Sequence, residues 1–136
     1  MLPEILTRLL WATAIVAAGL LLYRLVNARV LSRAAAKSHH NPLVTPGTPA
    51  ILYFTTPDCA ACKAVQRPAL KKLEARLGDR LQVLEINAYE RPDLAKDWGV
   101  MSVPTTFILD SQGRPQHVNH GATPAEKLLE QLGKVS

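Results

Sequence analysis

Residues 50–62 read AILYFTTPDCAAC, a short apolar run followed by a turn and two cysteines. The apolar run, Ala50–Thr55, is rich in strand formers, which is typical of a strand buried on both faces of a sheet. Thr56-Pro57-Asp58 reads as a turn. Apolar residues then recur at helical spacing, at Val65, Ala69, Leu73 and Leu77. The stretch therefore predicts a strand, a turn and a helix that begins at Cys59.

The chain after this point continues to alternate between strand and helix patterns. We expect Pro68 to kink the first helix and Gly78 to end it. The later elements are expected to be a strand over 81–87, a short helix over 91–98, two strands over 105–109 and 114–120, and a last helix that starts at Thr123. A helical crossover makes the first two strands parallel, and a tight turn makes the last two antiparallel. The sequence thus predicts an α/β domain with a four-stranded mixed sheet flanked by helices.

The N-terminal part of the chain has a different pattern. Leu9 to Tyr23 carries no charge, and with its apolar neighbours the run covers residues 5–26. That length suits the roughly 30 Å hydrocarbon core of a membrane. We therefore expect one transmembrane helix as an anchor over 1–26, with residues 5–26 in membrane lipid. A basic and proline-rich linker over 27–49 is expected to follow, and then a domain over 50–136. A cleaved signal peptide and a buried core helix are the alternatives. The weak basic character ahead of the run argues against the first, and the completeness of the remaining domain argues against the second.

Charge is also unevenly distributed. Residues 1–41 carry five bases against one acid, whereas residues 42–136 carry 11 bases against 10 acids. A nucleic-acid-binding protein is expected to have a basic patch on its folded domain, so we expect no nucleic-acid partner. Bases follow the uncharged stretch Leu9–Tyr23 closely, at Arg24, Arg29, Arg33 and Lys37. The positive-inside rule therefore favours a single-pass membrane protein with its domain on the cytoplasmic side.

Cys59 and Cys62 are the only cysteines, and their place at a helix start indicates redox chemistry. The first helical turn has free N–H groups and favours a thiolate, so Cys59 is expected to attack, and Cys62, one turn further in, to resolve the mixed disulfide. This chemistry needs no bound cofactor. A structural zinc ion needs four ligands, and the other candidates are His39, His40, His117 and His120. We expect no metal ion. Two buried, inert cysteines are the remaining alternative.

Taken together, these motifs resemble the thioredoxin family over roughly residues 48–133. The resemblance rests on the Cys59–Cys62 pair, Pro68 in the helix that follows, Ser102-Val103-Pro104-Thr105 before the third strand, and Gly121 ahead of the last helix. It implies a thioredoxin-like fold with a CAAC active site. It also implies that the Val103–Pro104 peptide bond is cis, and that Val103 and Pro104 bind the client peptide. From the residues alone, Pro104 could simply start a strand.

Several positions depart from the family. Asp58 stands where the family has a tryptophan, and its charge should make the Cys59 thiolate harder to form and select clients with basic surfaces. Tyr53 replaces a buried aspartate, and Glu85 replaces a lysine on the neighbouring strand. Glu85 is therefore a candidate catalytic residue that exchanges a proton with Cys62 through water. The alternative is an edge charge that reaches solvent. The first strand and helix of full-length thioredoxin have no expected counterpart, because the chain before Ala50 is short and proline-rich.

The sequence therefore predicts a membrane-tethered thiol–disulfide oxidoreductase that reduces the disulfides of client proteins. Its upstream electron donor would be a thioredoxin reductase on the cytoplasmic side. On the periplasmic or other extracytoplasmic side, which many anchored thioredoxin-like proteins of bacteria face, it would be a membrane electron carrier. The alternative is a non-catalytic accessory or redox-switch subunit of a larger membrane complex.

Overall fold

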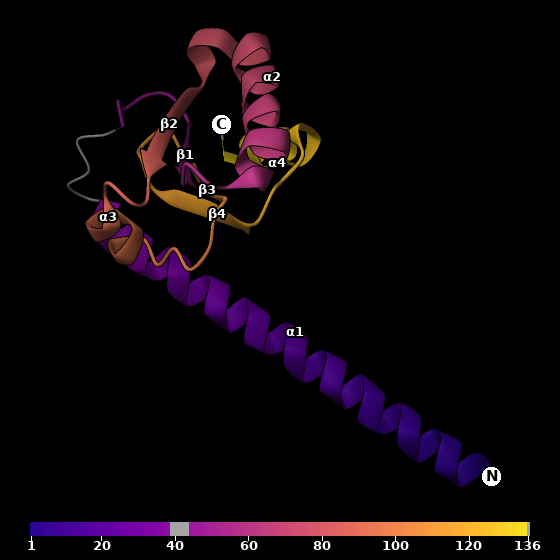
Figure 1. Cartoon of the computed structure of the whole chain (residues 1–136). Helices are drawn as coiled ribbons and strands as arrows, with labels where there is room; N and C mark the ends of the chain where they lie inside the picture. The colour runs from indigo at the N-terminus through magenta and orange to yellow at the C-terminus, as the bar shows by residue number, and fades with distance from the viewer. Residues whose placement is uncertain (39–43, 136) are drawn as a thin grey trace.

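The computed structural model describes residues 1–38 and 44–135, so His39 and His40 lie outside the described residues. Its helices and strands follow the order expected from the sequence, apart from details given below (Figure 1). In chain order they are α1 (Leu2–Ser38), β1 (Ala50–Thr55), η1 (Cys62–Gln66), α2 (Arg67–Leu77), η2 (Gly78–Arg80), β2 (Gln82–Asn87), α3 (Pro92–Asp97), β3 (Thr105–Leu109), β4 (Pro115–His120) and α4 (Ala125–Val135).

The four strands form one mixed sheet in the order β2-β1-β3-β4. Strand β1 is parallel to β2, with Ala50 opposite Gln82 and Thr55 opposite Asn87. Strand β3 is antiparallel to both β1 and β4. The expected four-stranded mixed sheet is therefore confirmed, with β1 and β3 at its centre.

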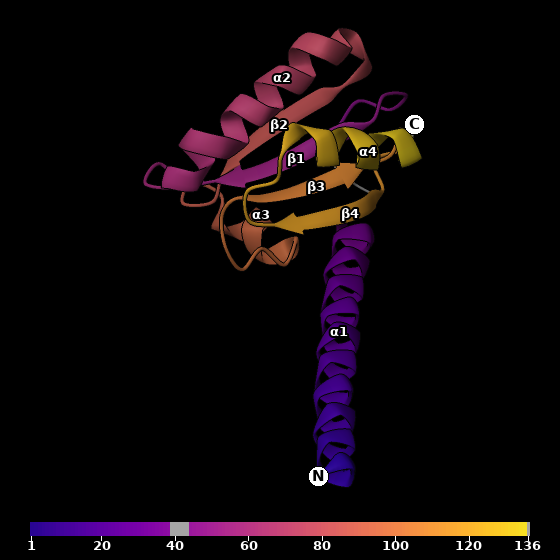
Figure 2. The ribbon, with the colours of Figure 1, turned by 90° about the vertical axis from the view of Figure 1, so that its right-hand side faces the viewer.

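Strand β1 is buried on both faces, as its apolar composition predicts. Ala50, Leu52 and Phe54 point to one face of the sheet and belong to a core cluster with Trp98 and Phe107. Ile51 and Tyr53 point to the other face and pack with residues of α2 and α4. Figure 2 shows the resulting layers, with α2 and α4 on one side of the sheet and α3 and the end of α1 on the other.

The helix that carries the cysteines contains a π-helical segment instead of the simple kink expected at Pro68. The chain is helical from Ala60, and η1 spans Cys62–Gln66. The backbone N–H of Arg67 donates to the carbonyl of Cys62, five residues earlier. Pro68 has no N–H to donate and sits in the first turn of α2. The widened turn thus falls just ahead of the proline, and α2 then continues as a regular helix.

Helix α1 is 37 residues long, which corresponds to about 55 Å. Within the described residues it is the one helix long and apolar enough to cross a membrane, with a mean hydropathy of 2.0 in its most apolar window. None of that window is buried against the rest of the protein. Figure 1 shows this part of α1 extending away from the sheet.

Residues 27–38, which we expected to belong to a basic and proline-rich linker over 27–49, form the last part of α1. Val30 is 7% exposed and Ala34 is fully buried, and both belong to the core cluster around Trp98. A β-carbon added to Gly99 would lie 3.6 Å from the Val30 side chain, so the two backbones approach closely. Burial of a side chain such as Val30 stabilises a fold by about 1.5–3 kcal/mol relative to exposure. The end of α1 therefore serves as a helix of the domain on the α3 face of the sheet.

Candidate active site

The two cysteines follow the turn that connects the central strand β1 to the next helix. Cys59 and Cys62 form a disulfide. Cys59 is partly exposed, whereas Cys62 is fully buried. The backbone N–H of Cys62 donates to Cys59 Sγ at 3.1 Å. A donor aimed at that sulfur also stabilises a thiolate there once the pair is reduced, so the geometry suits Cys59 as the attacking sulfur and Cys62 as the resolving one.

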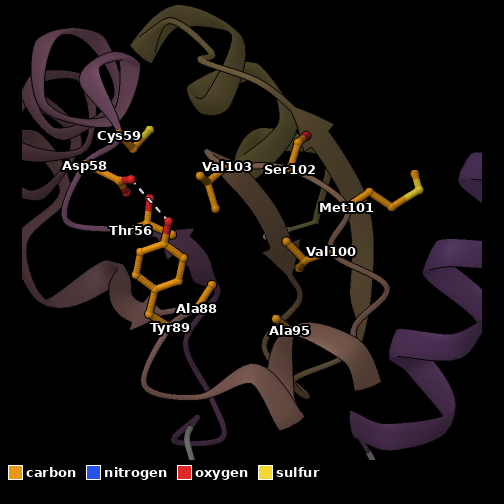
Figure 3. Close-up of a pocket in the computed structure, with 10 residues that line it drawn as sticks. All are labelled: Thr56, Asp58, Cys59, Ala88, Tyr89, Ala95, Val100, Met101, Ser102 and Val103. Atoms are coloured by element: carbon orange, nitrogen blue, oxygen red, sulfur yellow. Dashed lines mark hydrogen bonds between the residues drawn. The ribbon is translucent and has the colours of Figure 1, made fainter.

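The loop ahead of β3 faces Cys59. The Val103–Pro104 peptide bond is cis, which confirms the expectation drawn from the resemblance. Pro104 is buried, and its carbonyl accepts a hydrogen bond from the N–H of Gly121 at 2.8 Å. The hydroxyl of Thr105 donates to the carbonyl of Ser102 at 2.6 Å. These contacts hold the loop in one conformation. Val103 and Cys59 line the same hollow (Figure 3).

The hollow is an open groove of about 430 Å³ that begins at Cys59. Figure 3 shows Cys59 and Asp58 at one end and Met101 at the other. The apolar lining residues are Ala88, Ala95, Val100, Met101 and Val103. The polar lining residues are Thr56, Asp58, Tyr89 and Ser102. A client segment whose disulfide meets Cys59 would thus lie along a mostly apolar floor with a carboxylate at the reactive end.

Asp58 is held in place beside Cys59 by hydrogen bonds. The Tyr89 hydroxyl donates to Asp58 Oδ2 at 3.2 Å. The hydrogen bond with Thr56, then that with its own backbone and that with Tyr89, lower the pKa of Asp58 below its usual value. The same contact with Asp58 raises the pKa of Tyr89. Asp58 is therefore negatively charged throughout the pH range in which thiols ionise.

Glu85 lies on the same face of the sheet as Cys62 but at the solvent edge. Its side chain is 47% exposed and accepts a hydrogen bond from Arg67 Nη2 at 2.7 Å. Tyr53, opposite Glu85 in the ladder, is 1% exposed, and its hydroxyl has no hydrogen-bond partner among the described residues. The proton relay through Glu85 stays a prediction, and this placement favours the alternative of an edge charge.

Replacement of Glu85 by glutamine tests that relay. Because the carboxylate is half-exposed and bound to Arg67, we expect Glu85→Gln to leave the pH–rate profile of disulfide reduction in place, with rates within about twofold of the parent. The measurement is the rate of reduction of a neutral peptide disulfide between acid and alkaline pH. A displaced profile in Glu85→Gln, but not in a Glu74→Gln control on α2, would establish the relay.

Sequence reasoning missed two residues that support the site. Gln66 is fully buried, and its amide both donates to the carbonyl of Thr123 at 3.2 Å and accepts from the N–H of Thr123 at 3.0 Å. It ties the cysteine-bearing helix to the start of α4. Tyr89 orients Asp58. A polar residue one turn from Cys62 on the buried stripe could have indicated Gln66, whereas no local pattern marks Tyr89.

No metal centre accompanies the cysteines in the described part of the chain. Within residues 1–38 and 44–135, no three side chains of His, Cys, Asp or Glu gather as ligands. His117 lies on β4, and burial, with a smaller contribution from the charge of Lys134, lowers its pKa. His120 contacts Asn27 of α1, with Nε2 at 3.1 Å from Oδ1. His117 and His120, both on β4, therefore form no ligand group with the cysteines among the described residues.

Comparison with known proteins identifies relatives of this chain in sequence and in structure. Thioredoxin of Bacillus subtilis (strain 168) is 35% identical over 81 residues, which are 60% of this chain and 76% of that protein. Thioredoxin of Alicyclobacillus acidocaldarius is 32% identical over 64% of this chain and 81% of its own length. A solved structure of thioredoxin-2, a component of the malaria parasite protein secretion machinery, superposes on this chain with a TM-score of 0.64 at 24% identity. The superposition covers 69% of this chain and 89% of that one, and it confirms the thioredoxin-like fold. A model of the family described as Thioredoxin matches residues 30–134, so this chain belongs to the thioredoxin family.

Proposed function

We propose that the protein is a membrane-tethered thiol–disulfide oxidoreductase that reduces disulfides in client proteins. The family and the cysteine pair support thiol–disulfide exchange. The observation that carries the proposal is the asymmetry of the pair, with Cys59 accessible at the end of an open groove and Cys62 buried behind it. That asymmetry gives the two sulfurs different roles in one reaction.

The reaction begins with the reduced pair. The Cys59 thiolate attacks one sulfur of the client disulfide, so that a Cys59–client bond forms while the client disulfide breaks. The client sulfur that leaves takes up a proton. Cys62 then loses its proton and attacks Cys59, which releases the second client thiolate and closes the Cys59–Cys62 disulfide. Two electrons pass to the client, and an external dithiol or an upstream donor must return them.

The packing of α1 supports a retained anchor. The small-residue site at 34–36 is where a signal peptide could be cut, and cleavage there would remove Val30 from the core and disrupt the packing of Ala34. It would also expose the neighbouring Trp98, which is 2% exposed in the intact chain. A helix that completes the core is poorly suited to removal, so we propose that the span remains attached to the domain.

The side of the membrane is part of the proposal. Arg24 lies near the end of the apolar run and Arg29 and Arg33 lie just beyond it, which favours a cytoplasmic domain. There the electron donor would be a thioredoxin reductase. The periplasmic or extracytoplasmic face is the alternative, with a membrane electron carrier as donor.

The test is catalysis by the full-length chain in lipid nanodiscs. With excess dithiothreitol as electron source, we expect the protein to accelerate reduction of a peptide disulfide. Its reduction potential in thiol buffers should lie near that of thioredoxin, about −270 mV. A potential toward about −120 mV would mark an oxidant and contradict the reductive direction. If no turnover occurs while the disulfide still forms and opens, the accessory or redox-switch subunit replaces the enzyme.

Asp58→Asn tests whether this carboxylate selects clients with basic surfaces. Because the pKa of Asp58 is lowered, its charge is present at every pH at which the Cys59 thiolate forms, and it disappears only in acid. We expect the variant to lose preference for lysine-flanked over glutamate-flanked peptide disulfides, by about two- to fivefold at low salt, and to react with a neutral disulfide at lower pH.

The matched control is Glu90→Gln, since Glu90 is an exposed carboxylate that does not line the groove. An unchanged preference in Asp58→Asn, or an equal loss in both variants, would contradict a role for Asp58 in client selection.

A further inference from the structure

The domain is attached to α1 immediately beyond the membrane-crossing part of that helix. The apolar run ends at Val26, and Asn27 is the next residue. Asn27 Oδ1 lies 3.1 Å from Nε2 of His120, the last residue of β4. Val30, one turn further, packs against Gly99 and is buried with Trp98. A helix rises 1.5 Å per residue, so these contacts lie only about 2–6 Å beyond the end of the apolar run.

The same contacts flank the client-binding loop. His120 is paired with Thr105, the residue after Pro104, and the N–H of Gly121 binds the carbonyl of Pro104. Gly99 directly precedes Val100 and Met101 of the groove. Both ends of the loop 99–105 are thus fixed to the first turn of α1 beyond the span. Lipid headgroups occupy about 5–8 Å on each side of the hydrocarbon core, so the loop lies at headgroup level.

The groove opens toward the side of α1 at its apolar end. Met101 is 72% exposed, and Figure 3 shows its side chain pointing to the side on which α1 lies, away from Cys59. Tyr89, on the other wall, is 66% exposed. A segment that enters the groove past Met101 therefore comes from the side of α1, the helix that carries the span, and reaches Cys59 at the far end.

We propose that the clients are membrane proteins whose disulfide lies close to their own membrane span, at the end of a short segment that can pass along the groove from Met101 to Cys59. This inference rests on the proposed function, because it requires a tethered reductant. It adds that α1 acts as a rigid spacer that sets the height of the reaction, whereas a flexible tether would serve disulfides at any height within its reach. The reaction is the one given above, with the client disulfide reduced and the Cys59–Cys62 pair oxidised.

The test uses the pre-reduced full-length chain in nanodiscs, together with reporter peptides that contain one membrane-spanning helix. One reporter carries its disulfide after a short extended segment that can pass along the groove, and the other carries the same segment after a rigid helical spacer of about seven residues, or about 10 Å. A soluble peptide disulfide gives the basal rate. We expect the near reporter to be reduced at least about fivefold faster than the far one.

An insertion in α1 then changes the height of the active site above the membrane without changing any residue of the site. About seven polar helix-forming residues placed between Val26 and Asn27 lift the docked domain by about 10 Å and rotate it by only about 20°. We expect the preference to change to the far reporter while the basal rate is unchanged. The same insert placed after Met1 is the control and should keep the preference for the near reporter. Equal rates with both reporters, or a preference that the insertion does not change, would overturn the proposal. If the soluble peptide is not reduced, the proposed function itself fails.

Discussion

Replacing Cys59 by serine is expected to abolish disulfide reduction, whereas replacing Cys62 by serine is expected to stop the reaction one step later, with protein and client joined. Cys59 is the sulfur that the groove reaches, and it accepts the N–H of Cys62. Cys62 has no exposed surface and can attack only its neighbour. Either change should lower turnover at least about 1,000-fold, and the double variant should be no worse, because the two residues act as a unit.

The distinguishing measurement is the mixed disulfide, detected by mass spectrometry after reaction with a peptide disulfide. Cys62→Ser should accumulate the adduct on Cys59, and Cys59→Ser should form none at a comparable rate. Ala60→Ser, which places the same hydroxyl at an exposed position between the cysteines, is the matched control and should turn over normally. An adduct on Cys62 that forms as fast as the one on Cys59 would reverse the assigned roles.

The strands of the sheet could be predicted from the sequence because each is marked by a pattern of neighbouring residues. The strand β1 has the predicted bounds, Ala50–Thr55, and so does β3, Thr105–Leu109, since each is an unbroken apolar or β-branched run. The cysteine pair could likewise be placed at a helix start from the turn that precedes it. Elements whose pattern lies within some ten residues of chain were therefore predictable.

The docking of α1 could not be predicted in this way. Val30 and Ala34 lie one turn apart, but Arg29 and Arg33 beside them are equally typical of a helix that continues from a membrane into water. Their partners lie far along the chain, as with His120, 93 residues from Asn27. Separation along the chain also explains why the sequence did not predict the contact between Asp58 and Tyr89, which are 31 residues apart, or the ion pair between Glu85 and Arg67 at the solvent edge. Long-range pairing of polar side chains leaves no period in the sequence.

Trp98→Ala is expected to lower the free energy of unfolding by about 3–5 kcal/mol, the usual cost of truncating a buried tryptophan. The side chain is 2% exposed and sits between α3 and the sheet, with its ring centroid 5.0 Å from that of Phe107 in an edge-to-face arrangement. It does not line the groove, so the loss should appear in stability before it appears in client binding.

The chain offers a matched control in its other tryptophan. Trp11 is 68% exposed on the apolar part of α1, and Trp11→Ala should leave the stability of the domain within about 0.5 kcal/mol. Pulse proteolysis of the full-length protein in nanodiscs measures both variants without relying on tryptophan fluorescence. Trp98 shares its cluster with Val30 and Ala34, so its removal should also loosen the end of α1 and expose residues 27–34 to the protease. If Trp98→Ala costs less than about 1 kcal/mol, the layer formed by α3 and the end of α1 is not part of the cooperative core, and α1 cannot fix the height of the site above the membrane.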